Sequence, residues 1–146
     1  MTPHVLMVDD NPGDLQLIEE AFKDCRIDVA FLAATEAQAA FDYLALAASG
    51  AEPRPDVLLL DLNMPGMDGR EVIAALRRDP AWKHLPVVVL SGEKNVADMA
   101  ADEIWAKPDT YAKYCALAKS LQRYWSGPRR SGRAAPPAAS AATGAA

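Results

Sequence analysis

The chain of 146 residues has few of the features that mark secreted, fibrous or membrane proteins. Its two cysteines, Cys25 and Cys115, are too few for a disulfide scaffold, and we interpret both as reduced packing residues. No apolar run approaches the roughly 20 residues that a membrane helix needs. The first residues contain no basic region of the kind that begins a secretory signal. These absences predict a cytoplasmic protein with no membrane contact.

Acidic residues outnumber basic ones, and their distribution is uneven. The net charge is −5, from 20 acidic and 15 basic residues. All 20 acids precede residue 127, whereas Arg129, Arg130 and Arg133 follow it, so the body holds 12 basic and 20 acidic residues, a net charge of −8. Such a body repels phosphate backbones, which argues against nucleic-acid binding. It leaves open a site for a cation.

The composition changes at the end of the chain. Residues 127–146 are mostly Ala, Pro, Gly, Ser and Arg, and they include no aromatic residue that could enter a core. A segment of this kind has too little to bury to fold. We therefore expect one domain over residues 1–126, followed by a flexible tail over residues 127–146.

Five short apolar runs predict strands. They cover residues 5–8, 29–33, 57–60, 87–90 and 104–106. The run at 29–33 alternates with smaller residues and predicts an edge strand, whereas the continuous runs are typical of strands buried on both faces.

Helical patterns separate these runs. Asn11 with Pro12 marks the start of one helix, Thr35 with Gln38 resembles a capping box, and Asp68 opens a third helix. A last helix should run from near residue 109 to about residue 125. Alternation of strand and helix predicts a doubly wound α/β fold. Its five-stranded parallel sheet should have the order 2-1-3-4-5.

Polar side chains stand where the predicted strands end: Asp9, Asp10, Asp61, Ser91 and Lys107. Ligands of open parallel sheets bind at the carboxyl ends of the strands. Three carboxylates in one place repel each other and need a cation, and oxygen ligands favour Mg²⁺. A central carboxylate such as Asp61 can attack a phosphoryl group and form an acyl phosphate. Lys107 and the Ser91 hydroxyl would then contact the phosphoryl oxygens.

Four segments carry a resemblance to a known family. They are Val-Asp-Asp-Asn at 8–11, Leu-Asp-Leu-Asn-Met-Pro-Gly-Met-Asp-Gly at 60–69, Ser-Gly at 91–92 and Lys-Pro at 107–108. Together they resemble the response-regulator receiver domains (CheY-like) of two-component signalling, from residue 4 to about residue 125. Asp-Asn-Pro-Gly-Asp near the start and Gln-Arg-Tyr-Trp at the end of the domain also resemble the single-domain regulators of phytochrome-type histidine kinases.

The resemblance implies a role for each candidate residue. It makes Asp61 the phospho-acceptor. It implies that Asp9, Asp10, Asp61 and the backbone carbonyl of Asn63 hold Mg²⁺, with Asp9 acting through water. It also implies a phosphohistidine donor on a sensor histidine kinase, with a bacteriophytochrome as one candidate.

Two further roles come from the same resemblance. Ser91 is implied as the switch hydroxyl, and Lys107 as the contact to the phosphoryl group. The bond between Lys107 and Pro108 is expected to be cis. A protein of this kind would signal through altered association with itself or a separate partner, without an output domain and without being an enzyme.

Two departures from the family pattern concern the end of the sheet. Only 15 residues separate Ser91 from Lys107, so we expect a shortened fourth helix at 95–101. Ile104 stands where the family often has an aromatic residue. Trp105 should point to the opposite face of its strand. We therefore expect a phosphorylation switch to use loop and backbone movement more than an aromatic flip.

The last helix has two interpretations. Its apolar residues are Tyr111, Tyr114, Cys115, Leu117, Ala118, Leu121, Tyr124 and Trp125. They form either one wide core face or a core face with a second apolar strip. The second interpretation predicts a homodimer through the last helix region, or a docked partner helix.

Two other functions remain open at the level of sequence. An aspartyl-nucleophile phosphatase could use a similar sheet, but such enzymes place an acid two residues after the nucleophile, and this chain has Asn63 there. A phosphate-independent interaction module could keep the fold alone. The complete set of site residues argues against that module, whereas the short crossover leaves it open.

Overall fold

A computed structural model describes residues 2–66, 68–92 and 100–125, and its centre is one parallel sheet. The strands run in the order β2-β1-β3-β4-β5, as predicted, and each pairs with its neighbours in parallel. Their bounds are β1 His4–Val8, β2 Ala30–Ala34, β3 Val57–Asp61, β4 Val87–Ser91 and β5 Glu103–Ala106.

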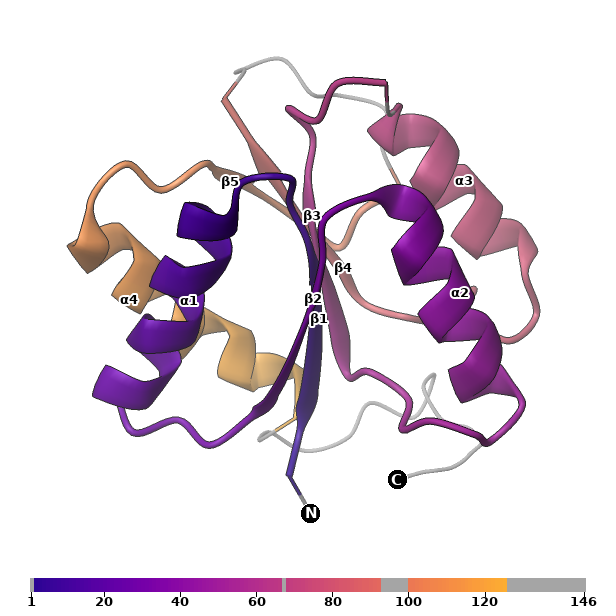
Figure 1. Ribbon diagram of the computed structural model, residues 1–146, viewed down its shortest axis with the longest axis horizontal. Coiled ribbons are helices and arrows are strands. Elements are labelled where there is room, and N and C mark those ends of the chain that lie inside the picture. The colour runs from indigo at the N-terminus through magenta and orange to yellow at the C-terminus, as the bar shows by residue number, and fades with distance from the viewer. Residues whose placement is uncertain (1, 67, 93–99, 126–146) are drawn as a thin grey trace.

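The described helices cover both faces of the sheet. Their bounds are α1 Pro12–Asp24, α2 Ala37–Ala48, α3 Gly69–Arg78 and α4 Tyr111–Leu121, and a 3₁₀ turn η1 at Gln122–Tyr124 follows α4. Helices α1 and α4 lie on one face, and α2 and α3 lie on the other (Figure 1). None of the helices described is long and apolar enough to cross a membrane.

The central strands supply two separate cores because their side chains alternate between the faces. In β1, Val5 and Met7 belong to the cluster beneath α1 and α4, whereas Leu6 and Val8 belong to the cluster beneath α2 and α3. All residues of β3 and β4 are buried. Continuous apolar runs therefore indicated these strands correctly.

Two of the three predicted helix caps are confirmed. The side chains of Asn11 and Asp68 cap α1 and α3, where they accept hydrogen bonds from backbone N–H groups two residues on. The predicted capping box at 35–38 is wrong. Helix α2 begins after Glu36, which makes no side-chain cap, and the Gln38 amide donates to Asp42 one turn later instead.

Helix α4 packs most of its apolar side chains into the core. The buried residues of α4 and η1 are Tyr114, Leu117, Ala118, Leu121 and Tyr124, and Cys115 and Trp125 pack partly buried against the same cluster. Tyr111 is exposed and bonds to Asp24 of α1 through its hydroxyl. The arrangement favours the interpretation of one wide core face.

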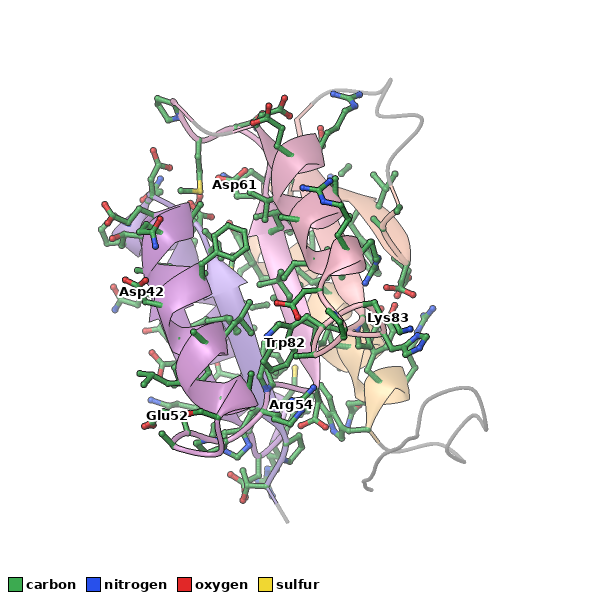
Figure 2. The ribbon with its side chains drawn as sticks, turned by 90° about the vertical axis from the view of Figure 1, so that its right-hand side faces the viewer. Asp42, Glu52, Arg54, Asp61, Trp82 and Lys83 are labelled. Atoms are coloured by element: carbon green, nitrogen blue, oxygen red, sulfur yellow. The ribbon has the colours of Figure 1, made fainter. Side chains whose placement is uncertain are left out.

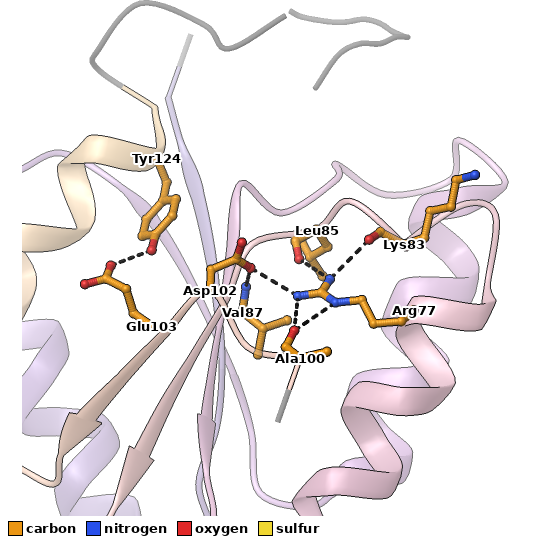
Figure 3. A network of polar contacts seen from close by, with 8 residues as sticks. All are labelled: Arg77, Lys83, Leu85, Val87, Ala100, Asp102, Glu103 and Tyr124. Carbon is orange, nitrogen blue, oxygen red and sulfur yellow. Dashed lines mark hydrogen bonds and ion pairs between the residues drawn. The ribbon is translucent and has the colours of Figure 1, made fainter. Parts of the chain in front are cut away.

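Arg77, near the end of α3, holds the segment that leads into β5 (Figure 3). Its guanidinium donates to the carbonyl of Ala100 at 2.8 and 3.0 Å and to the carbonyl of Leu85 at 2.7 Å. It also pairs with Asp102 at 3.1 Å, and the same carboxylate oxygen accepts the N–H of Val87 at 2.8 Å. One side chain thereby joins α3 to the starts of β4 and β5.

The shortened fourth helix expected at 95–101 falls mainly on residues 93–99, which lie outside the described residues. Ala100 and Ala101 are not helical. The prediction for the two faces of β5 is confirmed. Ile104 is 44% exposed, whereas Trp105 packs against the core beneath α1 and α4. The Trp105 indole donates to Glu103, which also accepts the Tyr124 hydroxyl (Figure 3).

The two ends of the sheet differ in character (Figure 2). At the amino end, the Arg54 guanidinium lies 4.1 Å from the ring centre of Trp82 and donates to the carbonyl of Ala81. This stacking covers a buried indole with a cation. Asp61 lies at the opposite end, where the carboxyl ends of the strands collect polar side chains.

Candidate functional site

The carboxyl edge of the sheet brings the predicted site residues together. Asp9 and Asp10 follow β1, Asp61 and Ser91 end β3 and β4, and Lys107 follows β5. Asp9, Asp10 and Asp61 each place one carboxylate oxygen within 4.8 Å of the others. Asp9, Asp61 and Ser91 are buried, whereas Asp10 is exposed. Strands far apart in the sequence thus produce one compact acidic site.

The backbone orients two of these carboxylates in the same way. Asp9 Oδ1 accepts the N–H of Asn11 at 2.9 Å, and Asp61 Oδ1 accepts the N–H of Asn63 at 2.9 Å. Each bond closes a short turn directly after a strand. The second oxygen of each carboxylate therefore faces Lys107.

The Lys107 ammonium is the cation at the centre of the site. Its Nζ lies 3.0 Å from Asp61 Oδ2 and 3.6 Å from Asp9 Oδ2. A further carboxylate oxygen, Asp14 Oδ2, lies at 2.9 Å. Burial alone would lower the pKa of Lys107, but the hydrogen bonds to Asp14 and Asp61 outweigh it and raise that pKa above its usual value. The lysine is charged under all ordinary conditions.

Asp9 is a buried carboxylate whose two oxygens are unequally satisfied. Its side chain is fully buried, and its Oδ2 makes no hydrogen bond within the described part of the chain. Burial, together with the charge of Asp61, raises the pKa of Asp9 to about 7, although the Asn11 N–H opposes the shift. An unsatisfied buried oxygen beside other carboxylates is a position where a cation would lower the energy.

The donor set fits a hard divalent cation. The candidate ligands are all oxygens, with no His or Cys among them. Oxygen ligands suit Mg²⁺, Ca²⁺ or Mn²⁺, whereas structural zinc sites use sulfur and nitrogen. The orphaned oxygen of Asp9 supports the same assignment.

Ser91 and Gly92 form the wall of the site at the end of β4. Ser91 is buried, and its carbonyl accepts the N–H of Lys107 at 2.9 Å, which ties the end of β4 to the start of the lysine loop. A Cβ atom at Gly92 would lie 3.0 Å from the side-chain nitrogen of Asn63. Glycine at this position therefore leaves room for the Asn63 carboxamide.

Asp14 is a site residue that the sequence did not indicate. It lies in the first turn of α1, where an acid is usually explained by the helix dipole. Its Oδ1 accepts the Tyr114 hydroxyl at 3.1 Å, so it bridges Lys107 and α4. Burial would raise the pKa of Asp14, but these hydrogen bonds lower it, while burial and Asp14 raise the pKa of Tyr114 to about 12.

The expected cis bond before Pro108 is wrong. The described peptide bonds include no cis bond, so Lys107 reaches Asp61 through a trans proline bond. A tertiary amide still prefers the trans form, by about 0.5–1 kcal/mol. No residue pattern in the chain had required the cis form.

The doubly wound sheet of order 2-1-3-4-5, with three acids and a lysine at its carboxyl edge, has the architecture of the CheY-like fold. The chain belongs to the response regulator receiver domain family, whose pattern it matches over residues 5–111.

Similar sequences and solved structures include regulators of red-light signalling. The chain is 38% identical over 98 residues to the response regulator Rcp1 of Synechocystis, covering 66% of this chain and 67% of Rcp1. A response regulator in red light signalling of R. palustris, RPA3017, superposes with a TM-score of 0.75 at 30% identity, over 85% of this chain and 94% of that one.

Two of the similar structures are a phosphorylated and a metal-bound response regulator. The phosphorylated cyanobacterial phytochrome response regulator RcpA matches with a TM-score of 0.73 at 30% identity, covering 86% of this chain and 94% of its own. The Mn²⁺-bound form of Rcp1 matches with a TM-score of 0.70 at 29% identity, covering 84% and 94%. The chain is thus similar to phytochrome response regulators.

Proposed function

We propose that this protein is a two-component response regulator that accepts a phosphoryl group on Asp61 from a sensor histidine kinase. One observation carries the proposal. The buried Asp61 carboxylate has one oxygen held by the Asn63 N–H, and its other oxygen lies 3.0 Å from Lys107 Nζ. A carboxylate in this setting is oriented for attack, and a cation stands beside it to balance the charge of an incoming phosphoryl group.

The transfer itself would exchange one bond for another. An Asp61 oxygen forms the new O–P bond while the N–P bond of the kinase phosphohistidine breaks. The electron pair of that bond stays with the imidazole nitrogen, and a solvent proton neutralises it. Lys107 would move its contact from the carboxylate to a phosphoryl oxygen, and the Ser91 hydroxyl would donate to another. These residues position the reacting groups and balance part of the charge, which are the main contributions to phosphoryl transfer.

A magnesium ion is the proposed cofactor. Asp10, Asp61 and the backbone carbonyl of Asn63 would hold it directly, and Asp9 would hold it through water. When bound, it would supply positive charge against the phosphoryl oxygens. The clustered oxygens of Asp9, Asp10 and Asp61 and the orphaned Asp9 Oδ2 support this assignment.

The proposed donor is the phosphohistidine of a bacteriophytochrome-type kinase. Similarity to RcpA and to the red-light regulator of R. palustris supports this choice. The acidic body does not favour nucleic acid as a partner. We place the protein in the cytoplasm, where such kinases present their phosphohistidine. The domain would be residues 1–126, and the tail at 127–146 lies outside the described residues.

The signal would pass through altered association, and we propose a homodimer that uses the last helix region. Most apolar side chains of α4 are already buried, so the apolar surface left for a partner includes the exposed side chains of Tyr111 and of Ile104 on β5. Sedimentation at micromolar concentration, with and without beryllium fluoride and Mg²⁺, tests this proposal. A single monomeric species under both conditions would exclude the dimer.

Incubation with acetyl phosphate and Mg²⁺, followed by intact mass, tests phosphoryl acceptance. We expect one added phosphoryl group on the wild type and none on Asp61→Asn. Asp68→Asn is the matched control, because asparagine also caps a helix and the same charge is lost a few residues away. Labelling of Asp61→Asn would refute the assignment. Absence of labelling in the wild type would favour the interaction module, and turnover of p-nitrophenyl phosphate would favour the phosphatase.

A further inference from the structure

The Lys107 ammonium has two acceptors at hydrogen-bond distance, and only one of them is the proposed nucleophile. Asp61 Oδ2 lies at 3.0 Å and Asp14 Oδ2 at 2.9 Å, while Asp9 Oδ2 is farther away at 3.6 Å. Asp14 is not part of the oxygen cluster of Asp9, Asp10 and Asp61 that could hold a metal. The Asp14 carboxylate therefore interacts with Lys107 without belonging to the candidate metal site.

The other oxygen of the Asp14 carboxylate is also hydrogen-bonded. Asp14 Oδ1 accepts the hydroxyl of Tyr114, which comes from α4 and is only 3% exposed. Tyr114 is packed among the core residues beneath α1 and α4. Lys107, Asp14 and Tyr114 thus form a chain of contacts from the carboxyl edge of the sheet to the last helix.

A phosphoryl group on Asp61 would compete with Asp14 for the lysine. The ammonium offers three N–H donors, and the carboxylates of Asp14 and Asp61 already occupy two directions. A phosphoryl dianion brings more negative charge than the carboxylate that it modifies. With the side chain of Asp14 only 16% exposed, water screens its charge poorly. The dianion and Asp14 therefore repel each other across the lysine.

We infer that Asp14 is a positioning residue that holds Lys107 while Asp61 is unphosphorylated and thereby opposes phosphorylation. When Lys107 leaves Asp14, the hydrogen bond between Asp14 and Tyr114 changes as well. The inference rests on the proposed function and extends it. Phosphorylation draws Lys107 away from Asp14, which leaves the Tyr114 hydroxyl as the remaining partner of that carboxylate. The contact between α1 and α4 at this point then changes with the state of Asp61. Such a route does not need the aromatic residue that Ile104 replaces.

The rate of labelling by acetyl phosphate tests the inference. Asp14→Asn keeps an oxygen for Tyr114 but removes the charge, and we expect its rate constant to rise roughly threefold to tenfold. Asp14→Glu restores the charge and should return the rate toward that of the wild type, which a merely structural role would not predict. Asp24→Asn is the matched control, because Asp24 makes the same kind of α1–α4 bond, to Tyr111, away from the lysine. Its rate should equal the wild-type rate.

The coupling to α4 needs a second readout. Beryllium fluoride with Mg²⁺ should shift the NMR signals of the amides around Tyr114 in the wild type, and the shifts should shrink in Tyr114→Phe, which keeps the pair of Asp14 with Lys107. Urea unfolding of each variant confirms that it is folded.

The outcomes separate the inference from the function on which it rests. A wild-type protein that takes up no phosphoryl group refutes the proposed function. A wild-type protein that is labelled, together with Asp14→Asn labelled at the same rate or more slowly, refutes the role of Asp14 alone. Equal acceleration in Asp14→Asn and Asp24→Asn also refutes it, because the effect would then follow net charge. Undiminished amide shifts in Tyr114→Phe refute the coupling to α4.

Discussion

Replacing Arg77 by methionine should loosen the attachment of β5 to the rest of the sheet. Methionine keeps most of the apolar stem but removes every N–H donor of the guanidinium. The wild-type side chain donates to the carbonyls of Ala100 and Leu85 and pairs with Asp102. Asp102 still accepts the N–H of Val87, so one part of the network survives.

The size of the loss in stability depends on how far these contacts are exposed to solvent. A typical protein hydrogen bond contributes about 0.5–1.5 kcal/mol net. The bond to Leu85 is partly buried, whereas those to Ala100 and Asp102 are exposed, so water can replace part of the loss. We expect Arg77→Met to lower the free energy of unfolding by about 1–3 kcal/mol. Arg77→Lys should recover only part of it, because one ammonium cannot reproduce the planar fork.

Urea unfolding gives the measurement. Arg78→Met is the control, since Arg78 lies in the same last turn of α3 and is exposed, and it should lose only the small benefit of a cation near a helix end, about 0.3–1 kcal/mol. Equal losses in the two variants would show that the contacts of Arg77 add nothing. Because β5 leads to Lys107, acetyl phosphate labelling of Arg77→Met should also be slower than labelling of Arg78→Met.

Three further predictions concern the site. Burial raises the pKa of Asp9 from 3.8 to about 7, so the metal-free folded protein holds a proton that the unfolded chain releases, and its unfolding free energy relative to Asp9→Asn should fall as pH rises from about 4 to about 7 in urea titrations. A constant difference would contradict this. Gly92→Ala should move the Asn63 carboxamide and slow acetyl phosphate labelling, with stability changed by less than about 1 kcal/mol; faster labelling would contradict the close approach. Structures with and without beryllium fluoride should show one Trp105 rotamer, and a rotamer change coupled to Ser91 would contradict this expectation.

Local patterns predicted most of the fold. A strand or helix is recognised by the period of its apolar residues, and that period is visible in a single segment. The buried runs at 57–60 and 87–90 became β3 and β4 with one more residue each. The caps at Asn11 and Asp68 were equally local. The box at 35–38 does not form because α2 begins after Glu36, and the Gln38 amide donates to Asp42 instead.

The sequence by itself determined which polar residues end the strands, because parallel strands must place their carboxyl ends at one edge. Asp9, Asp61 and Lys107 could be assigned to one site on that ground alone. The tertiary structure decided how they are held and which other residues join them. Asp14 meets Lys107 and Tyr114 only after α1 and α4 pack side by side, and no spacing in the chain encodes a contact between residues 100 positions apart.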